Sequence, residues 1–301
     1  MVWSEPTTKN QRPKTNTETN TDNPFPAVVS SPRMYPTLVR FGNFEITTFG
    51  LMMFLAFILG GVVLARQFRR YGLDEELAST IVMAGAIGGI VGGKVYYAIL
   101  FRNWQLLFDR AGLVWYGGLI GGFLAASYVV RRRRADYLTA ADCAAPALSL
   151  GYALGRIGCF LVGDDYGRPT NEWFGVAFPK GSPPTTAQSL REFGSPVDPS
   201  LPSDTVLSVH PTQLYETAAA LVMFVILLRL NNRPHRKGLG WGLFMIMLGV
   251  ERFFVEFVRA KDDRFLGPFT VAQLISVLLI IAGLVFVTRK TATVAPVNAP
   301  A

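Results

Sequence analysis

Apolar residues in this chain cluster in long stretches instead of recurring at the spacing of an amphipathic helix or strand. Several stretches of about twenty residues carry too little charge to be anything but membrane spans. The predicted spans are residues 48–67, 79–100, 112–130, 138–160, 213–230, 239–258 and 269–288. The pattern therefore predicts an all-α, polytopic membrane helical bundle with seven transmembrane helices. The fourth span is the weakest, because Asp142, Pro146 and Arg156 interrupt it.

Polar segments flank and interrupt these spans. Residues 1–40 are expected to form a disordered polar tail, since they hold too little apolar surface to offset the entropy of ordering. The membrane domain is expected to cover residues 41–290, followed by a flexible tail at 291–301. The long segment 161–212 carries six prolines between its residues 179 and 202. It is expected to be an irregular loop and not a second domain.

The composition excludes an ordinary soluble domain. Of the 301 residues, 50% are hydrophobic and only 17% are charged, and the mean hydropathy is +0.31. Soluble domains carry roughly a quarter charged residues. Cys143 and Cys159 fall in one predicted helix, about 24 Å apart at about 1.5 Å per residue, which is too far for a disulfide.

The net charge of +8 follows the predicted topology. Arginines and lysines cluster after the first, third, fifth and seventh spans, most densely at Arg131–Arg134. Because such clusters mark cytoplasmic loops, the N-terminus is expected outside and the C-terminus in the cytoplasm. This explains the basic composition without a nucleic-acid partner. Contact of Arg131–Arg134 with anionic lipid is a weaker second interpretation.

Glycines recur at four-residue spacing in the second and third spans, for example at Gly88 and Gly92 and at Gly117 and Gly121. This spacing puts small residues on one helix face, so two backbones can approach closely. We therefore predict tight packing between helices here.

Two motifs place polar residues near the outer ends of predicted spans. In the segment 155–167, Arg156 precedes a glycine-rich turn that carries two carboxylates, Asp164 and Asp165. Arginine suits a phosphate because its planar fork donates paired hydrogen bonds, but an interfacial arginine above a tight turn is an equally good interpretation. The motif His210–Glu216 opens the fifth span, with His210 as the expected N-cap and Pro211 at the first helical position. A helix N-terminus attracts anions, although capping alone would also explain His210.

A third motif, Arg252, Glu256 and Arg259, forms one helical stripe that is expected to face the bundle interior. A purely structural ion pair is the alternative. Residues from five spans thus fall in the outer half of the membrane, and they include Lys94, Tyr116, Arg156, Asp164, His210 and this stripe. For Lys94, snorkelling to the interface is an equally good interpretation. An arginine-rich cavity there favours an anionic lipid headgroup. No cluster of His, Cys and carboxylates has the spacing of metal ligands, so neither a metal nor a cofactor is expected.

These motifs, together with Tyr116-Gly117-Gly118-Leu119-Ile120-Gly121-Gly122, resemble those of the bacterial prolipoprotein diacylglyceryl transferases over about residues 45–290. The resemblance implies transfer of a diacylglyceryl group from phosphatidylglycerol to the lipobox cysteine thiol of prolipoprotein signal peptides. The products would be a thioether-linked lipid and glycerol phosphate. It also implies a multi-pass protein of the bacterial inner membrane, surrounded by membrane lipids, with its active site towards the outer leaflet.

The resemblance can be carried over residue by residue. The matching positions are Arg156, Gly167, His210, Gln213, Tyr215, Glu216, Arg252, Glu256 and Arg259, and Asp164 shortens the usual glutamate. Phe49 and Tyr116 stand where the family has tyrosine and histidine, and Cys159 and Val162 replace two asparagines. The matches imply that Arg156, Arg252, Arg259, Gly167 and Gln213 bind phosphatidylglycerol. They also imply that His210, Tyr116, Arg252, Glu256 and Asp164 serve catalysis.

Two function classes follow from this pattern. In a transferase, Arg156 and Arg252 would stabilise the charge that grows on the departing phosphate, with Arg259 guiding the headgroup. The base would be His210, whose ordinary pKa suits the task, or Tyr116 at the usual histidine position. The second class is a protein that binds or moves anionic phospholipid without transfer chemistry, which the substituted polar positions favour. A transporter ranks last, because inverted repeats and matching broken spans are missing.

Overall fold

The computed structural model describes residues 37–41, 44–109, 112–261, 264–266 and 269–297. These residues divide into two compact units, one formed by 79–135 and the other by 37–78 together with 136–297. Most of the predicted tail 1–40 lies outside the described residues. Its last four residues belong to the strand β1 (Thr37–Phe41), which pairs with β2 (Phe44–Thr47).

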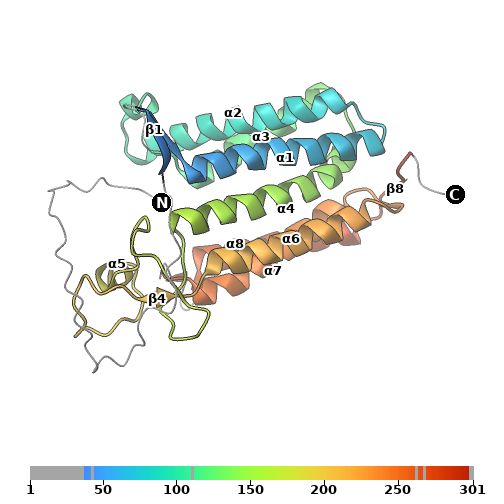
Figure 1. The fold of residues 1–301 in the computed structure, drawn as a ribbon. Helices are drawn as coiled ribbons and strands as arrows, with labels where there is room; N and C mark the ends of the chain where they lie inside the picture. The colour runs from blue at the N-terminus through green and yellow to red at the C-terminus, as the bar shows by residue number, and fades with distance from the viewer. Residues whose placement is uncertain (1–36, 42–43, 110–111, 262–263, 267–268, 298–301) are drawn as a thin grey trace. The chain divides into compact units, whose positions relative to one another are not determined.

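Five long helices build the described part of the larger unit. They are α1 (Thr48–Arg70), α4 (Tyr137–Val162), α6 (Thr212–Leu230), α7 (Leu239–Val255) and α8 (Val271–Thr288). The helix α4 is central, since it packs against α1 on one side and against α6 and α7 on the other, while α8 packs against α7 (Figure 1). The short 3-10 helix η2 (Glu256–Val258) continues α7. Any site built on α4, α6 and α7 therefore lies among three helices in mutual contact.

The helix α4 runs unbroken through the three residues that weaken the predicted fourth span. Asp142 is buried, and its two carboxylate oxygens accept hydrogen bonds from the backbone N–H groups of Gly238 and Trp241 at 2.7 and 2.8 Å. These groups open α7, so a buried charge is compensated by the positive end of a helix. An apparent interruption in the sequence is thus a contact between two helices.

By length and composition, α1, α2 (Glu75–Leu100), α4, α6 and α8 are each able to cross a membrane. The helices α3 (Trp115–Arg132) and α7 coincide with the two remaining predicted spans. They are less suited alone, since α7 has only 17 residues and the last turn of α3 carries Arg131 and Arg132. The chain is therefore a mostly helical, polytopic membrane protein, and the seven-span arrangement stays a prediction.

The smaller unit contains most of α2, the 3-10 helix η1 (Trp104–Leu107) and α3. A Cβ atom added to Gly92 would lie 2.3 Å from the carbonyl oxygen of Gly117. One added to Gly121 would lie 2.3 Å from that of Gly88. No side chain fits at such distances, so the predicted close packing of the glycine faces is confirmed.

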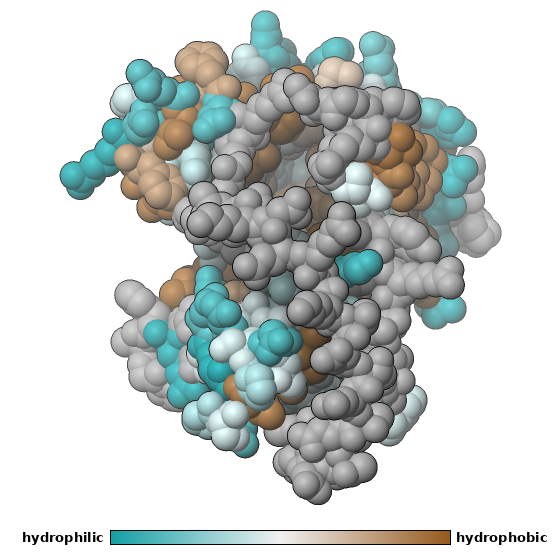
Figure 2. All heavy atoms as spheres, turned by 60° about the vertical axis from the view of Figure 1, so that its left-hand side comes forward, coloured by the Kyte–Doolittle hydropathy of each residue, from teal (hydrophilic) through white to brown (hydrophobic). Residues whose placement is uncertain are grey.

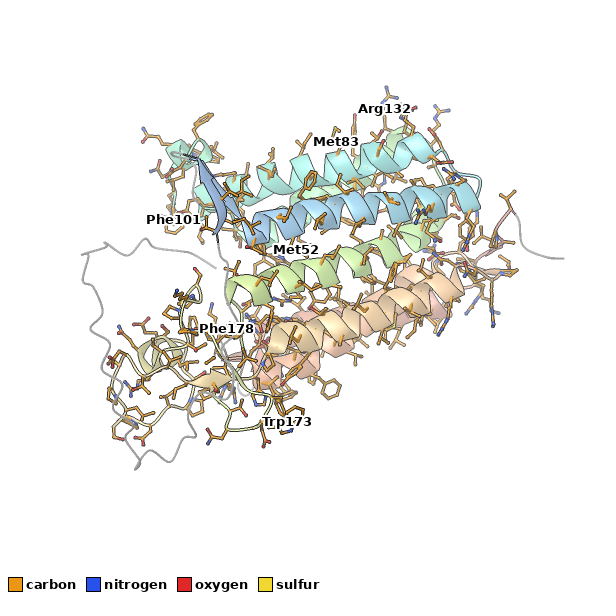
Figure 3. All side chains as sticks on the ribbon, in the orientation of Figure 1. Met52, Met83, Phe101, Arg132, Trp173 and Phe178 are labelled. Carbon is orange, nitrogen blue, oxygen red and sulfur yellow. The ribbon has the colours of Figure 1, made fainter. Side chains whose placement is uncertain are left out.

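Residues 163–211, here called the α4–α6 segment, are more ordered than the expected irregular loop. They contain α5 (Ala187–Glu192) and the pair β3 (Val176–Ala177) and β4 (Ser208–Val209). Tyr166, Phe178 and Leu190 are buried in a small apolar cluster of its own. Phe178 lies where the segment meets α4 (Figure 3), with its ring 5.6 Å from that of Phe160. The face of the segment turned forward in Figure 2 carries many hydrophilic atoms.

Two further strand pairs lie at the other loops. The strand β5 (His235–Arg236) pairs with β8 (Thr293–Val294), so the first part of the predicted C-terminal tail is held against the loop between α6 and α7. The strand β6 (Arg264–Leu266) pairs with β7 (Phe269–Thr270) ahead of α8.

Candidate active site

The end of α4 sets the geometry of the site. Gly163 follows the helix in the left-handed conformation (φ 71°), and its N–H donates to the carbonyl oxygen of Cys159 at 2.8 Å. Asp165 is also left-handed, at φ 55°, a conformation that aspartate tolerates better than most residues. The turn therefore reverses the chain and directs the side chain of Asp165 back towards Arg156 on the last turns of α4.

Three arginines and three carboxylates form a closed ring of alternating charge, here called the ion ring. Arg156 binds Asp165 at 2.8 Å and Glu216 at 2.5 Å. Arg252 lies 3.6 Å from Glu216 and 2.7 Å from Glu256. Arg259 closes the ring, at 3.4 Å from Glu256 and 2.8 Å from Asp165. The members come from α4, the turn after it, α6, α7, η2 and the residue after η2, so the fold assembles residues that are far apart in the sequence.

The ion ring is largely desolvated. Glu216 and Glu256 have side chains only 1% exposed, whereas Asp165 is 21% exposed. The arginine side chains are between 12% and 22% exposed. Burial alone raises the pKa of Asp165, but Arg259 and Arg156 outweigh that effect and hold the pKa well below its ordinary value. Asp165 is therefore ionised near neutral pH. By formal charge, the three guanidinium groups of the ring balance its three carboxylates.

Two guanidinium nitrogens of the ring carry N–H groups that are not used in hydrogen bonds. The Nε atom of Arg156 and the Nη1 atom of Arg252 are buried and form no hydrogen bond within the described part of the chain. An unpaired buried donor costs free energy unless a ligand or water satisfies it. The arginines on both sides of Glu216 therefore keep donors for an acceptor such as a phosphate oxygen.

Gln213 and Thr212 support the turn from the start of α6. The amide Nε2 of Gln213 donates to the carbonyl oxygen of Asp164 at 2.6 Å, and the hydroxyl of Thr212 donates to that of Asp165 at 2.9 Å. Gln213 is fully buried, and its Oε1 atom forms no hydrogen bond to any described residue. The structure thus places Gln213 beneath the carboxylate turn, and its contact with lipid stays a prediction.

Gly167 lies where two chain segments converge. A Cβ atom there would meet the carbonyl oxygen of Val258 at 2.5 Å and the Cβ of His210 at 2.7 Å. Its N–H donates to the carbonyl oxygen of His210 at 2.9 Å, and the next N–H, that of Arg168, donates to Val258 at 2.8 Å. A side chain at Gly167 would push apart the segments that carry His210 and Arg259, which explains glycine at this motif position.

Asp164 faces a different environment from Asp165. Its Oδ1 atom is buried and forms no hydrogen bond, and no ion pair to Asp164 exists among the described residues. Burial raises its pKa to about 6. The carboxylate that contacts the arginines is thus the second of the two adjacent aspartates and not the one at the motif position.

His210 lies just before α6. The helix begins one residue later than predicted, at Thr212, so Pro211 and not His210 is its N-cap. Its Nδ1 atom is 3.3 Å from the hydroxyl of Tyr215, and its ring is 5.8 Å from that of Phe174. Burial lowers the pKa of His210, although Glu172 offsets part of this effect. The imidazole is therefore neutral at pH 7, as a proton acceptor must be.

Tyr116 and Lys94 belong to the smaller unit. Tyr116 is the second residue of α3, and its ring packs edge-on against that of Trp115 at 5.4 Å. Lys94 donates a hydrogen bond to the carbonyl oxygen of Asp109 at 2.5 Å. Their participation in the site stays a prediction.

Three residues that form or adjoin the ion ring were not identified from the sequence. Asp165 was passed over for its neighbour, and Tyr152 and Glu251 were not singled out. The hydroxyl of Tyr152 donates to Glu216 at 3.1 Å and lies 3.3 Å from an oxygen of Glu251. Their spacing carried a signal, since Tyr152 precedes Arg156 by one helical turn and Glu251 adjoins Arg252.

Three of the four positions that depart from the family pattern lie on α4 or pack against it. The Sγ atom of Cys159 is 3.8 Å from Nη1 of Arg156. Phe49 packs against α4, with a ring carbon 3.2 Å from where a Cβ of Gly158 would be. The third, Val162, is the last residue of α4. The substitutions therefore leave the ion ring closed.

Comparisons with known proteins agree with the motifs. The family model described as prolipoprotein diacylglyceryl transferase matches residues 36–289. A phosphatidylglycerol–prolipoprotein diacylglyceryl transferase of Geobacter sulfurreducens is 32% identical over 277 residues, covering 86% of this chain and 97% of that protein. Proteins with the same description from Clostridium tetani and Xanthomonas campestris are 30% and 31% identical. These alignments cover 83% and 87% of this chain, and 96% and 94% of the relatives.

Proposed function

Because the chain belongs to the prolipoprotein diacylglyceryl transferase family and is a membrane transferase, we propose that it uses phosphatidylglycerol as donor and a lipobox cysteine as acceptor. The sulfur of the cysteine forms a bond to the glyceryl carbon that carries the phosphate. The bond between that carbon and the phosphate oxygen breaks, and glycerol phosphate leaves with the electron pair. The thiol proton passes to a base of the enzyme.

The observation that carries this proposal is the pair of unused donors at Arg156 Nε and Arg252 Nη1. Negative charge grows on the phosphate oxygen as the carbon–oxygen bond breaks. Donors that are already oriented and partly desolvated stabilise that charge more than they stabilise the ground state. Arg156 and Arg252 therefore stabilise the departing oxygen of the phosphate, and Arg259, at the next corner of the ion ring, guides the headgroup by binding another oxygen of the same phosphate. Glu216 and Glu256 hold the three guanidinium groups in place.

His210 is our choice for the base. It is neutral at pH 7 because burial lowers its pKa, and Gly167 connects its backbone to that of the segment before Arg259. Within the described residues its side chain contacts Tyr215 and Phe174 and no member of the ion ring. We therefore place the acceptor cysteine between His210 and the ring. Tyr116 stays the alternative base.

The arrangement in the membrane follows from the charge pattern. We propose seven spans with the N-terminus outside, which puts the ion ring and the α4–α6 segment at the outer leaflet of the bacterial inner membrane. Phosphatidylglycerol and the signal peptide would then reach the ring from the outer leaflet. The glycine-packed α2 and α3 complete the helical domain.

A transfer assay tests this function. The purified chain is incubated with phosphatidylglycerol vesicles and a lipobox peptide, and the lipidated peptide and released glycerol phosphate are measured together. Complementation of cells depleted of their own transferase provides the test in vivo. Binding of phosphatidylglycerol without release of glycerol phosphate would favour the second class, a lipid-binding relative without transfer chemistry.

A further inference from the structure

Asp165 differs from the other two carboxylates of the ion ring. Glu216 and Glu256 are on helical elements and are 1% exposed, whereas Asp165 is on a turn and is 21% exposed. Glu216 is further held by the hydroxyl of Tyr152. Asp165 is thus the one carboxylate of the ring that can leave without moving a helix.

The contacts of Asp165 resemble those of a bound phosphate. One oxygen accepts from Arg156 and the other from Arg259, both at 2.8 Å. Two oxygens of one tetrahedral anion bridge a pair of guanidinium groups in the same way, since arginine pairs with carboxylate and phosphate through similar geometry. Asp165 therefore occupies a position between two arginines that a phosphodiester would also fit.

A phosphate could bind either in addition to the six groups of the ring or in place of Asp165, and the charge balance favours one of these two modes. The ring is neutral when all six groups are present. A phosphodiester added to it would leave an uncompensated negative charge at a largely buried site, which is costly. A phosphodiester that replaces Asp165 keeps the ring neutral. We propose that Asp165 is a displaceable counter-ion, which bridges Arg156 and Arg259 in the empty enzyme and swings out when the phosphate of the lipid binds.

This inference rests on the proposed function and adds a built-in competitor to the site. Asp165 keeps the arginines paired and correctly oriented between turnovers. It also helps to expel glycerol phosphate, since the carboxylate returns as the product leaves. Asp165 lies on the turn between Gly163 and Gly167. Gln213 and Thr212 hold the carbonyl groups of this turn and leave the carboxylate of Asp165 to exchange its partners.

The first test compares Asp165→Asn with Asp164→Asn at pH 8, with glycerol phosphate as the probe. Both variants remove one negative charge, but only Asp165 bridges two arginines. If the bridged form is about tenfold more populated than the open form, Asp165→Asn tightens glycerol phosphate inhibition about tenfold and lowers the KM for phosphatidylglycerol. Product release slows, so kcat falls. The effect of Asp164→Asn is smaller, and Asp165→Glu, which restores the charge, moves both constants back towards wild type.

The second test uses the wild-type protein alone and does not depend on a variant that folds. Backbone amides of residues 163–167 are followed by hydrogen exchange with and without glycerol phosphate. Displacement of Asp165 predicts faster exchange in the bound state, whereas a fixed ring predicts slower exchange.

Three results would overturn the displacement. They are slower exchange of this turn, weaker binding by a folded Asp165→Asn variant, and equal effects of the two variants. If the wild type transfers lipid normally and any of these results is found, the displacement is contradicted and the proposed function stands. A wild type that neither transfers nor binds contradicts the proposed function itself.

Discussion

Arg156 on α4 and Glu216 on α6 are joined end to end, with 2.5 Å between the guanidinium Nη2 and the carboxylate Oε1. Glu216 also lies 3.6 Å from Arg252 on α7, so one carboxylate serves arginines from two helices. In such a desolvated pair, a charge that loses its partner costs more than the intact pair contributes. Glu216 thereby sets both the direction of Arg156 and the charge balance of the site.

We expect Glu216→Gln to destabilise the protein. The amide keeps the shape but leaves Arg156 and Arg252 without their shared counter-charge, which costs about 3–5 kcal/mol for a buried pair. Thermal unfolding of the purified protein in detergent measures the effect. Glu192→Gln is the matched control, since Glu192 is exposed on α5 and such changes stay within about 0.5 kcal/mol. Equal unfolding midpoints for both variants would contradict this role of Glu216.

Arg156→Ala and Arg252→Ala should each lower the transfer rate by roughly 10²–10³-fold, the usual weight of one preorganised donor at developing negative charge. The release of glycerol phosphate from phosphatidylglycerol measures it. Lys180→Ala serves as the cation control, because Lys180 is exposed on the α4–α6 segment. Unchanged rates in either folded arginine variant would refute the phosphate role.

His235 predicts a pH-dependent stability at the other end of the helices. Its Nε2 atom lies 3.5 Å from the buried carboxylate of Asp142, and its Nδ1 atom lies 2.9 Å from the carbonyl of Arg233 and 3.4 Å from the hydroxyl of Tyr71. Burial lowers the pKa of His235, but the contacts with Asp142 and Arg233 outweigh it and raise the pKa above the ordinary value. The protonated histidine therefore stabilises the fold fully below about pH 6.5, and this contribution is lost as the pH rises through the higher folded-state pKa.

The comparison of wild type with His235→Gln isolates this group. We expect the variant to be less stable at pH 6, with the gap closing towards pH 8. Asp164, with its pKa of about 6, titrates in both proteins and cancels in the difference. Unfolding midpoints from pH 5.5 to 8.5 measure it, and a gap that does not change with pH would contradict the assignment.

The helices were largely predictable, because membrane spans are long apolar runs that need no knowledge of their partners. Six of the seven predicted spans begin within three residues of the start of a helix in the structure, and the seventh helix, α2, begins four residues before its predicted span. Tertiary contacts were not predictable in the same way. Asp142 looked like an interruption of its span, but its cost is removed by the start of α7, almost a hundred residues later.

The sequence identified most of the charged residues of the site, but it did not predict which residues pair with one another. Arg156, Arg252, Glu256 and Arg259 were identified, and the structure brings all four into one ring with Glu216. The sequence could not decide between the two adjacent aspartates. That choice depends on the left-handed backbone at Asp165, which follows from how the chain reverses after α4 and not from residue type.

The orientation of the chain can be tested by labelling. We expect Lys180→Cys, in the α4–α6 segment, to react with a membrane-impermeant maleimide in intact cells. Arg133→Cys, in the basic run after α3, should react only after permeabilisation, because positive loops stay in the cytoplasm. Both sites are exposed in the structure, so labelling reports sidedness and not burial. The reverse pattern would put the ion ring at the cytoplasmic leaflet and contradict the proposed acceptor.

The identity of the base is settled by His210→Gln and Tyr116→Phe measured together. His210 is neutral at pH 7 because burial lowers its pKa, so its loss should lower turnover by roughly 10²–10⁴-fold, the usual weight of a general base, with little change in lipid binding. In wild type the rate should fall only below about pH 6.5, where the imidazole becomes protonated, and this acidic limb should vanish in His210→Gln. Tyr116→Phe should cost less, since a tyrosine that only donates a hydrogen bond moves no proton. An inactive Tyr116→Phe beside an active His210→Gln would exchange the two roles.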